Sequence, residues 1–330
     1  MRADDNQLAE RYTTAAEQLG HDQAAVRLAG VYAMARLADD WTEQRQVCIN
    51  VLCAYLRMPY EPDPGRRWRP PAVLGWPQAG RKRGPAGGWL RYLRPAIHKE
   101  GEREVRQTII RVIRDHLRLV PKHPHSWQGL DFDFTRVTFD GGDFSRAVFS
   151  GGKVTFTDAK FTGGEVTFTD AEFSGGEVYF DDAEFSGGTV HFRGKFSGGM
   201  VHFIGAEFSG SSVLFGGAKF TSGEVHFGGA EFSGGTVHFD DAEFSGGMVH
   251  FIGAEFRGSS VLFGGAKFTS GEVDFGGAEF SGGEVSLHRR GVQRRNGPLH
   301  RRGVPRRDGP LRQRGVPRRN GPLRPRGVQR

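Results

Sequence analysis

Cysteine is scarce in this sequence: only Cys48 and Cys53 occur among 330 residues. They lie in an apolar helical stretch, which indicates reduced core thiols and excludes a disulfide framework or a cysteine-rich metal site. No apolar run reaches the length of about 18 residues that a transmembrane helix needs. The first residues enter a polar helical pattern that is unlike a signal peptide. We therefore expect a cytoplasmic protein with no membrane span.

Phenylalanine and tryptophan are each absent from long parts of the chain. All 27 phenylalanines lie between Phe132 and Phe280, and all 5 tryptophans precede them. Charge divides in the same way: residues 1–129 carry 21 basic and 14 acidic side chains, residues 130–288 carry 9 and 23, and residues 289–330 carry 15 and 1. The formal net charge of +7 is therefore the sum of three unlike segments.

The first segment has helical periodicity. Apolar residues recur at spacings of three and four in residues 1–60, which predicts an α-helical module. Asp40 and Glu43 have the spacing of a capping box and predict the start of its third helix. Residues 61–101 are rich in Pro, Gly and Arg and predict a linker. A helix within residues 102–126 is expected to pack on the module or to cap the next domain.

The strongest pattern lies in residues 127–287, where phenylalanine recurs. It first recurs every five residues, and a small or apolar residue stands two positions before each one. This block contains Phe134, Phe139, Phe144 and Phe149. Later the period lengthens to twelve, as Val-x-Phe-x-x-Ala-x-Phe-x-x-x-x, and its first units are Val154, Phe156, Ala159, Phe161 and Val166, Phe168, Ala171, Phe173. Alternate residues of an extended segment face one side, so these residues are expected to point inward.

These positions predict a mainly β fold, a parallel β-solenoid in which each coil buries its phenylalanines against its neighbours about 4.8 Å away. Pairs of glycines, such as Gly163 and Gly164, supply the corners. We favour 24 residues per coil, because two phenylalanines in each twelve residues would crowd a smaller coil. A near-exact duplication of 48 residues fits either 24 or 12 residues per coil.

The recurrent phenylalanines with their small or apolar partners resemble the pentapeptide-repeat family. The helical segments resemble actinobacterial members that have an N-terminal helical region. The stretches that carry this second resemblance are residues 24–33, 39–41, 53–59 and 127–131. The resemblance implies a right-handed quadrilateral β-helix and, for most members, no known activity. Such relatives often have a membrane-spanning segment before the helices, and we expect none in this chain.

The tail, residues 288–330, contains 15 arginines and no aromatic residue and also repeats every twelve residues. A coding sequence for the consensus unit Phe-Thr-Gly-Ala-Glu-Phe-Ser-Gly-Gly-Thr-Val-His, read from its third base, translates as the sequence of residues 288–299. We interpret the tail as a frameshifted, disordered continuation of the repeat. Resequencing tests this, because a gene without the shift continues the valine and phenylalanine units. The alternative is an evolved arm, and in either case the tail would bind nucleic acid only non-specifically.

Candidate chemical groups are few. His202, His226 and His250 alternate with inward residues, so in a 24-residue coil they would form one outward column, followed by Asp274. A metal-binding or pH-sensing column is one interpretation, and a solvated strand face is the favoured one. No nucleophile and base have catalytic spacing, and no Gly-Lys-Ser/Thr phosphate loop is present. We therefore predict no enzyme activity, no cofactor and no metal.

Two functional hypotheses follow. In the first, the protein is a structural or protein-interaction scaffold, and its partner is another protein. In the second, the acidic solenoid acts as a DNA mimic that binds a type II topoisomerase such as DNA gyrase, as the resemblance implies for some family members. The acidic excess also keeps an exposed, glycine-rich sheet soluble, so the scaffold is favoured.

Overall fold

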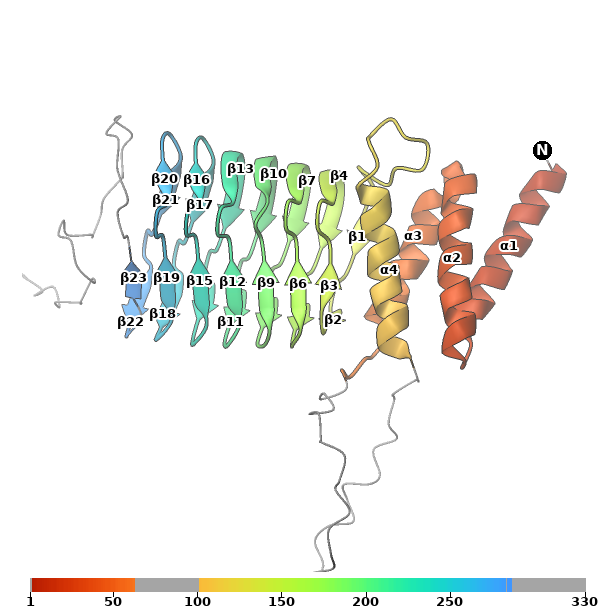
Figure 1. Ribbon diagram of the computed structural model, residues 1–330, viewed down its shortest axis with the longest axis horizontal. Coiled ribbons are helices and arrows are strands. Elements are labelled where there is room, and N and C mark those ends of the chain that lie inside the picture. The colour runs from red at the N-terminus through yellow and green to blue at the C-terminus, as the bar shows by residue number, and fades with distance from the viewer. Residues whose placement is uncertain (1, 63–100, 283, 287–330) are drawn as a thin grey trace, which may run out of the picture.

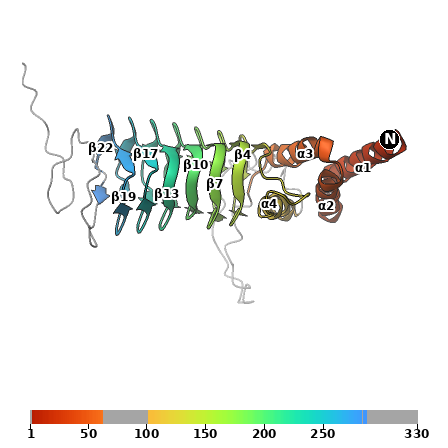
Figure 2. The same cartoon turned by 90° about the horizontal axis from the view of Figure 1, so that it is seen from above.

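The computed structural model describes residues 2–62, 101–282 and 284–286. It has a helical module at one end and a long stack of β-coils at the other (Figure 1). Seen from above, the coils follow one another in a single row that begins beside the helices (Figure 2). The predicted tail of residues 288–330, and residues 63–100 of the predicted linker, lie outside the described residues.

The N-terminal residues form helices where the apolar periodicity predicts them. The helices are α1 (Arg2–Gly20), α2 (Ala24–Asp40), the short 3-10 helix η1 (Thr42–Gln44), α3 (Arg45–Arg57) and α4 (Glu102–Leu117). Within the described residues, no helix combines the length and the apolar character needed to cross a membrane.

The predicted capping box at Asp40 is wrong. Asp40 is the last residue of α2, and its carboxylate pairs with Arg11 of α1 at 2.7 Å. The residue before α3 is Gln44, whose side chain caps no backbone group. An ion pair between helices has replaced the local cap, and the Arg11 hydrogen bond holds the pKa of Asp40 below its ordinary value.

Helix α4 joins the module to the solenoid. Its apolar stripe is buried, as the spacing predicts, and consists of Val105, Ile109, Val112, Ile113 and Leu117. The helix packs on α2 on one side and on β3 (Gly142–Asp143) on the other. It therefore both packs on the module and covers the first coil of the solenoid.

The solenoid consists of three parallel sheets. The first sheet bends around a corner and so supplies two faces; its strands are β1 (Phe132–Asp133), β4 (Val148–Thr155), β7 (Glu172–Tyr179), β10 (Lys195–His202), β13 (Lys219–His226), β16 (Glu243–Phe244), β17 (Met248–His250), β20 (Lys267–Phe268) and β21 (Glu272–Asp274). The second contains β2 (Thr138–Phe139), β5 (Lys160–Phe161), β8 (Glu184–Phe185), β11 (Glu207–Phe208), β14 (Glu231–Phe232), β18 (Glu255–Arg257) and β22 (Glu279–Ser281). The third contains β3, β6 (Glu165–Thr167), β9 (Thr189–His191), β12 (Ser212–Leu214), β15 (Thr236–His238), β19 (Ser260–Leu262) and β23 (Glu284–Ser286).

The strand register shows the length of one coil. Val201 pairs with Val225, 24 residues later, so two twelve-residue units make one turn. Val178 pairs with Val201, only 23 residues later, because a unit is one residue short at this point. There Gly194 donates its backbone N–H to Phe192 O at 2.8 Å and closes a tighter turn. A side chain at Gly194 would place its Cβ 2.5 Å from Ala171 O, so only glycine fits.

The core consists of columns of phenylalanine. Rings from successive coils stack nearly parallel, as in the series Phe185, Phe208 and Phe232, with centroids 4.7 and 4.6 Å apart. The predicted inward residues are all buried: Val154, Phe156, Ala159, Phe161, Val166, Phe168, Ala171, Phe173, Phe134, Phe139, Phe144 and Phe149. Burying so many aromatic rings supplies the main stabilising free energy of the fold.

Candidate functional site

Because the inward positions are filled by the core, any binding group must lie on an outer face. Outward side chains repeat at the same position of each coil, so parallel pairing places them in columns along the solenoid. Two columns contain a run of one ionisable residue type. One contains histidines and lies on the first sheet, and the other contains glutamates and lies on the second sheet.

The structure places His202, His226 and His250 in one column. They end β10, β13 and β17, and each pairs in register with the next. The rings of His202 and His226 stack with centroids 5.3 Å apart, and those of His226 and His250 with centroids 4.8 Å apart. Tyr179 precedes the histidines in the column, and its ring centroid lies 4.9 Å from that of His202. Asp274 follows His250 in register.

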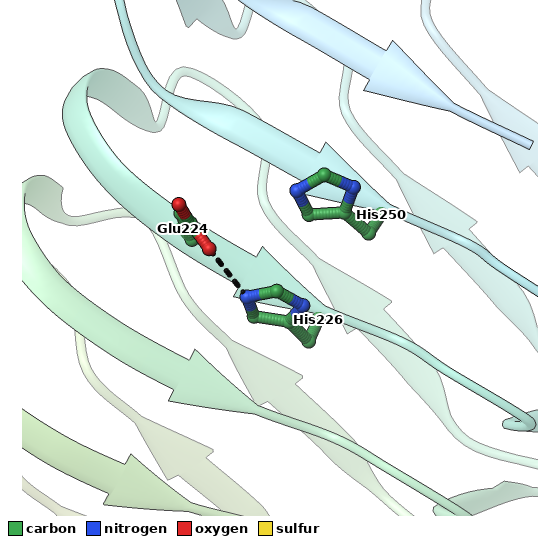
Figure 3. Close-up of side chains that lie close together, drawn as sticks. All are labelled: Glu224, His226 and His250. Carbon is green, nitrogen blue, oxygen red and sulfur yellow. Dashed lines mark hydrogen bonds and ion pairs between the residues drawn. The ribbon is translucent and has the colours of Figure 1, made fainter.

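A glutamate that the sequence analysis did not single out lies close to two of these histidines. Glu224 Oε2 lies 2.8 Å from His226 Nε2. One ligand atom each from Glu224, His226 and His250 lie within 4.8 Å of one another. In Figure 3, a ring nitrogen of each histidine lies on the side of Glu224. His202 is not in this group, although it belongs to the same column.

Several imidazole nitrogens of this column are buried without a partner. Both ring nitrogens of His202, and Nδ1 of His250, have no hydrogen bond within the described structure. Burial lowers the pKa of His202 below its ordinary value, and the neighbouring Asp181 carboxylate opposes that effect. A buried polar atom usually has a partner, so these nitrogens require an explanation.

The other histidines with outward positions have local partners instead. On the third sheet, His238 Nδ1 lies 2.9 Å from Asp240 Oδ2, and His238 Nε2 lies 3.1 Å from Thr236 Oγ1. Its neighbours in the column are Leu214 and Leu262, so no second imidazole is next to it.

The glutamate column follows the second sheet through consecutive coils. It contains Glu184, Glu207, Glu231, Glu255 and Glu279. Basic side chains neutralise part of it. Lys160 Nζ lies 2.6 Å from Glu184, and Arg257 pairs with Glu231 at 3.7 Å and with Glu255.

A hollow of about 390 Å³ lies where α4 meets the first coils. It is open to solvent, and its lining includes Arg103, Gln107, Asp143 and Glu165. Arg103 is already paired with Asp140 at 2.9 Å, and Gln107 donates to Gly141 O at 2.8 Å. These groups serve to attach the helix to the solenoid.

Neither cysteine has the properties of a nucleophile. Cys48 and Cys53 are buried in α3, and their exposed fractions are 0% and 1%. Burial raises the pKa of the Cys48 thiol to about 11 and that of Cys53 to about 12. A thiol acts as a nucleophile only as the thiolate, so both are inert at neutral pH.

Comparison with known families supports the repeat assignment. Residues 134–184 match the family model described as pentapeptide repeats (9 copies). This match does not confirm the predicted actinobacterial type, and comparison with curated proteins found no match. The phenylalanine columns that start in the matched coils continue in register to Phe268 and Phe280. The chain therefore contains pentapeptide repeats in residues 134–184, and a helical module precedes its solenoid.

Proposed function

We propose that this protein is a non-catalytic scaffold that binds another protein through one outer face of its solenoid. A pentapeptide-repeat solenoid fits such a role, because its coils stack into a stiff body whose outward side chains are held at fixed spacings. The helical module covers one end and leaves the lateral faces open (Figure 1).

The observation that carries this proposal is an apolar and histidine-containing surface formed by strands of the first sheet and the turns that follow them. We call it the histidine face and define it by Met200, His202, Ile204, Glu224, His226, Met248, His250 and Ile252. Met200, Ile204 and Ile252 are exposed by 38%, 47% and 51%. Exposed apolar side chains that gather on one face of a soluble protein are typical of an interaction surface.

The histidine face has a mixed character that suits a protein partner. Strand pairing places Met200 and His202 on one side of Glu224 and His226, and Met248 and His250 on the other. Ile204 and Ile252 lie in the turns that follow these two outer strands. Methionine is enriched in protein interfaces, and its flexible side chain adapts to different partners.

The test is affinity capture from a lysate of the native host. The bait is the full chain, in comparison with the double variant I204E/I252E and with L214E, an outward change on the third sheet. A stoichiometric partner that binds the parent and L214E, and is lost with I204E/I252E, supports the proposal. Identical capture by all three proteins contradicts it. Circular dichroism of the variants controls for folding.

The second hypothesis, DNA mimicry, is favoured only by the glutamate column. Its charges repeat at the strand spacing of about 4.8 Å, whereas phosphates in one DNA strand repeat about every 3.4 Å along the helix axis. A DNA gyrase supercoiling assay separates the two hypotheses. Inhibition that is abolished by E207Q/E231Q would favour mimicry, and unchanged supercoiling at micromolar protein would remove it.

A further inference from the structure

We propose that Glu224, His226 and His250 form a binding site for a late first-row divalent cation, with Zn²⁺ as the expected ion. The site lies within the histidine face, but the inference does not depend on the proposed scaffold function. Two imidazoles and one carboxylate are a ligand set that zinc uses in proteins.

The first argument is geometric. The three ligand atoms lie within 4.8 Å of one another. Around tetrahedral Zn²⁺ with bonds of about 2.0–2.2 Å, ligand atoms stand about 3.4 Å apart. The side chains therefore need to approach by little more than about 1 Å. Glu224 already lies 2.8 Å from His226, so the movement is mainly that of the His250 ring. The two rings stack at an interplanar angle of 17°, so they must also rotate for both nitrogens to point at one ion. Rotation about the terminal torsion of histidine has a broad energy minimum.

The second argument concerns unused hydrogen-bonding capacity. Glu224 and His226 already interact at 2.8 Å, so one half of the site is ordered without a metal. His250 shares no hydrogen bond with either residue, and its Nδ1 is buried without a partner in the described structure. A cation bound to one nitrogen of each ring would give His250 a partner and would replace the hydrogen bond of His226.

The third argument is that the backbone fixes the ligands. Glu224 and His226 are both in β13, and His250 is at the paired position of β17 in the next coil. Inward Val225 and Val249, each at most 1% exposed, anchor the two strands in the core. Rigid strands reduce the entropy lost when the ligands are ordered. A bound cation would link two consecutive coils.

Three protein ligands leave at least one position of a tetrahedral ion open. Met200 and Met248 flank Glu224 in register on both sides. The open position faces solvent, since Glu224 and His226 keep 36% and 26% of their side-chain surface exposed. Water or a partner's side chain can occupy it.

The test is a Zn²⁺ titration of the full chain, without a histidine tag, by isothermal calorimetry. One equivalent is expected to bind, and E224Q, H226Q and H250Q are each expected to weaken binding by at least about tenfold. H238Q is the matched control, because His238 has a carboxylate partner but no neighbouring histidine, and it should keep the parental affinity. M248E adds a carboxylate beside Glu224 and should tighten binding.

The absorption spectrum of bound Co²⁺ provides a second readout, independent of calorimetry. The parent is expected to show the intense d–d absorption of four-coordinate Co²⁺, and H250Q should not. All substitutions are at outward positions, and circular dichroism checks their folding. Weak binding of many equivalents, or equal losses in H238Q and H250Q, would overturn the proposal.

Discussion

At the scale of single residues, the corners of the solenoid depend on backbone conformations that only a few residues adopt. In each twelve-residue unit the residue before the small alanine has a positive φ, and it is either glycine or aspartate, as at Asp158 (φ 57°) and Gly229 (φ 63°). Aspartate tolerates this left-handed region better than most residues do, because its short side chain can form local hydrogen bonds. The alternation of Asp and Gly in the repeat thus has a conformational cause.

The glycine pairs give a sharp prediction, because the two members differ. Gly164 has a φ of 67°, and a Cβ there would lie 2.3 Å from the backbone oxygen of Asp140 in the preceding coil. A Cβ at Gly163 would contact nothing within 4 Å. We expect Gly164→Ala to destabilise the protein by more than the ~1–2 kcal/mol of left-handed strain alone. Gly163→Ala should be neutral or slightly stabilising.

Thermal unfolding followed by circular dichroism checks this pair. The melting temperature should fall clearly for Gly164→Ala and remain at or above the parental value for Gly163→Ala. Equal effects of the two substitutions would show that the corner does not require the close approach of backbone seen at Gly164.

The cysteines give a second prediction at this scale. Because burial raises the pKa of Cys48 to about 11 and that of Cys53 to about 12, neither forms a thiolate at pH 8 in the folded state. Both thiols should resist a disulfide reagent such as DTNB in the native protein and react fully in guanidinium chloride. Rapid labelling without denaturant would contradict the buried positions in α3.

The histidine column could be predicted from sequence, whereas its carboxylate partner was missed. Two periodicities were sufficient for the histidines: alternation placed them outward, and a 24-residue coil placed His202, His226 and His250 in register. Glu224 stands two residues before His226, so the same alternation places it on the same face. Whether Glu224 approaches the histidines depends on the rotamer of its side chain. The sequence period does not predict that rotamer.

At the scale of elements, the phenylalanine columns distribute stability unevenly along the solenoid. Phe208 is 1% exposed and is stacked on both sides. Phe268 belongs to a neighbouring column, is 38% exposed and, among the described residues, is stacked on Phe244 alone. Phe208→Ala should cost about 3–5 kcal/mol, the usual range for a buried phenylalanine. Phe268→Ala should cost less than half as much.

Urea unfolding of the two variants measures this difference. Repeat arrays often depart from two-state behaviour, so the midpoints should be compared before any free energy is extracted. Similar losses of stability in both variants would mean that Phe268 is as well packed as Phe208.

Elements were predictable where a strong period exists and unpredictable where tertiary contacts decide. The strands follow directly from recurring Val and Phe, and α4 from its buried stripe that begins at Val105. The capping box at Asp40 failed because Arg11, distant in sequence, offered its carboxylate an ion pair. The choice between 12 and 24 residues per coil needed the register, since both lengths produce the same sequence period.

At the scale of the whole molecule, the helical module closes the edge of the solenoid that would otherwise expose unpaired strands. Its side chains bind backbone groups of the first coil. Gln46 accepts from Asp131 N at 3.0 Å and donates to Asp131 O at 2.8 Å. Gln107 donates to Gly141 O at 2.8 Å, and Arg118 donates to Ser145 O at 2.7 Å. Open edges invite pairing with other chains, and here side chains occupy the edge beside the first and the third sheet.

This arrangement predicts how the first coil responds when its cover is weakened. The variant Q46A/Q107A/R118A removes these four hydrogen bonds and leaves backbone groups without partners, each at a cost of about 1–3 kcal/mol where they stay buried. Hydrogen exchange should accelerate in residues 131–145, while the distal coils keep their protection, because each coil contacts only its neighbours. R136A is the control, since the Arg136 side chain is 79% exposed and meets only Asp158 at 3.5 Å. Uniform acceleration along the solenoid would instead show that the helices stabilise the whole stack as one cooperative unit.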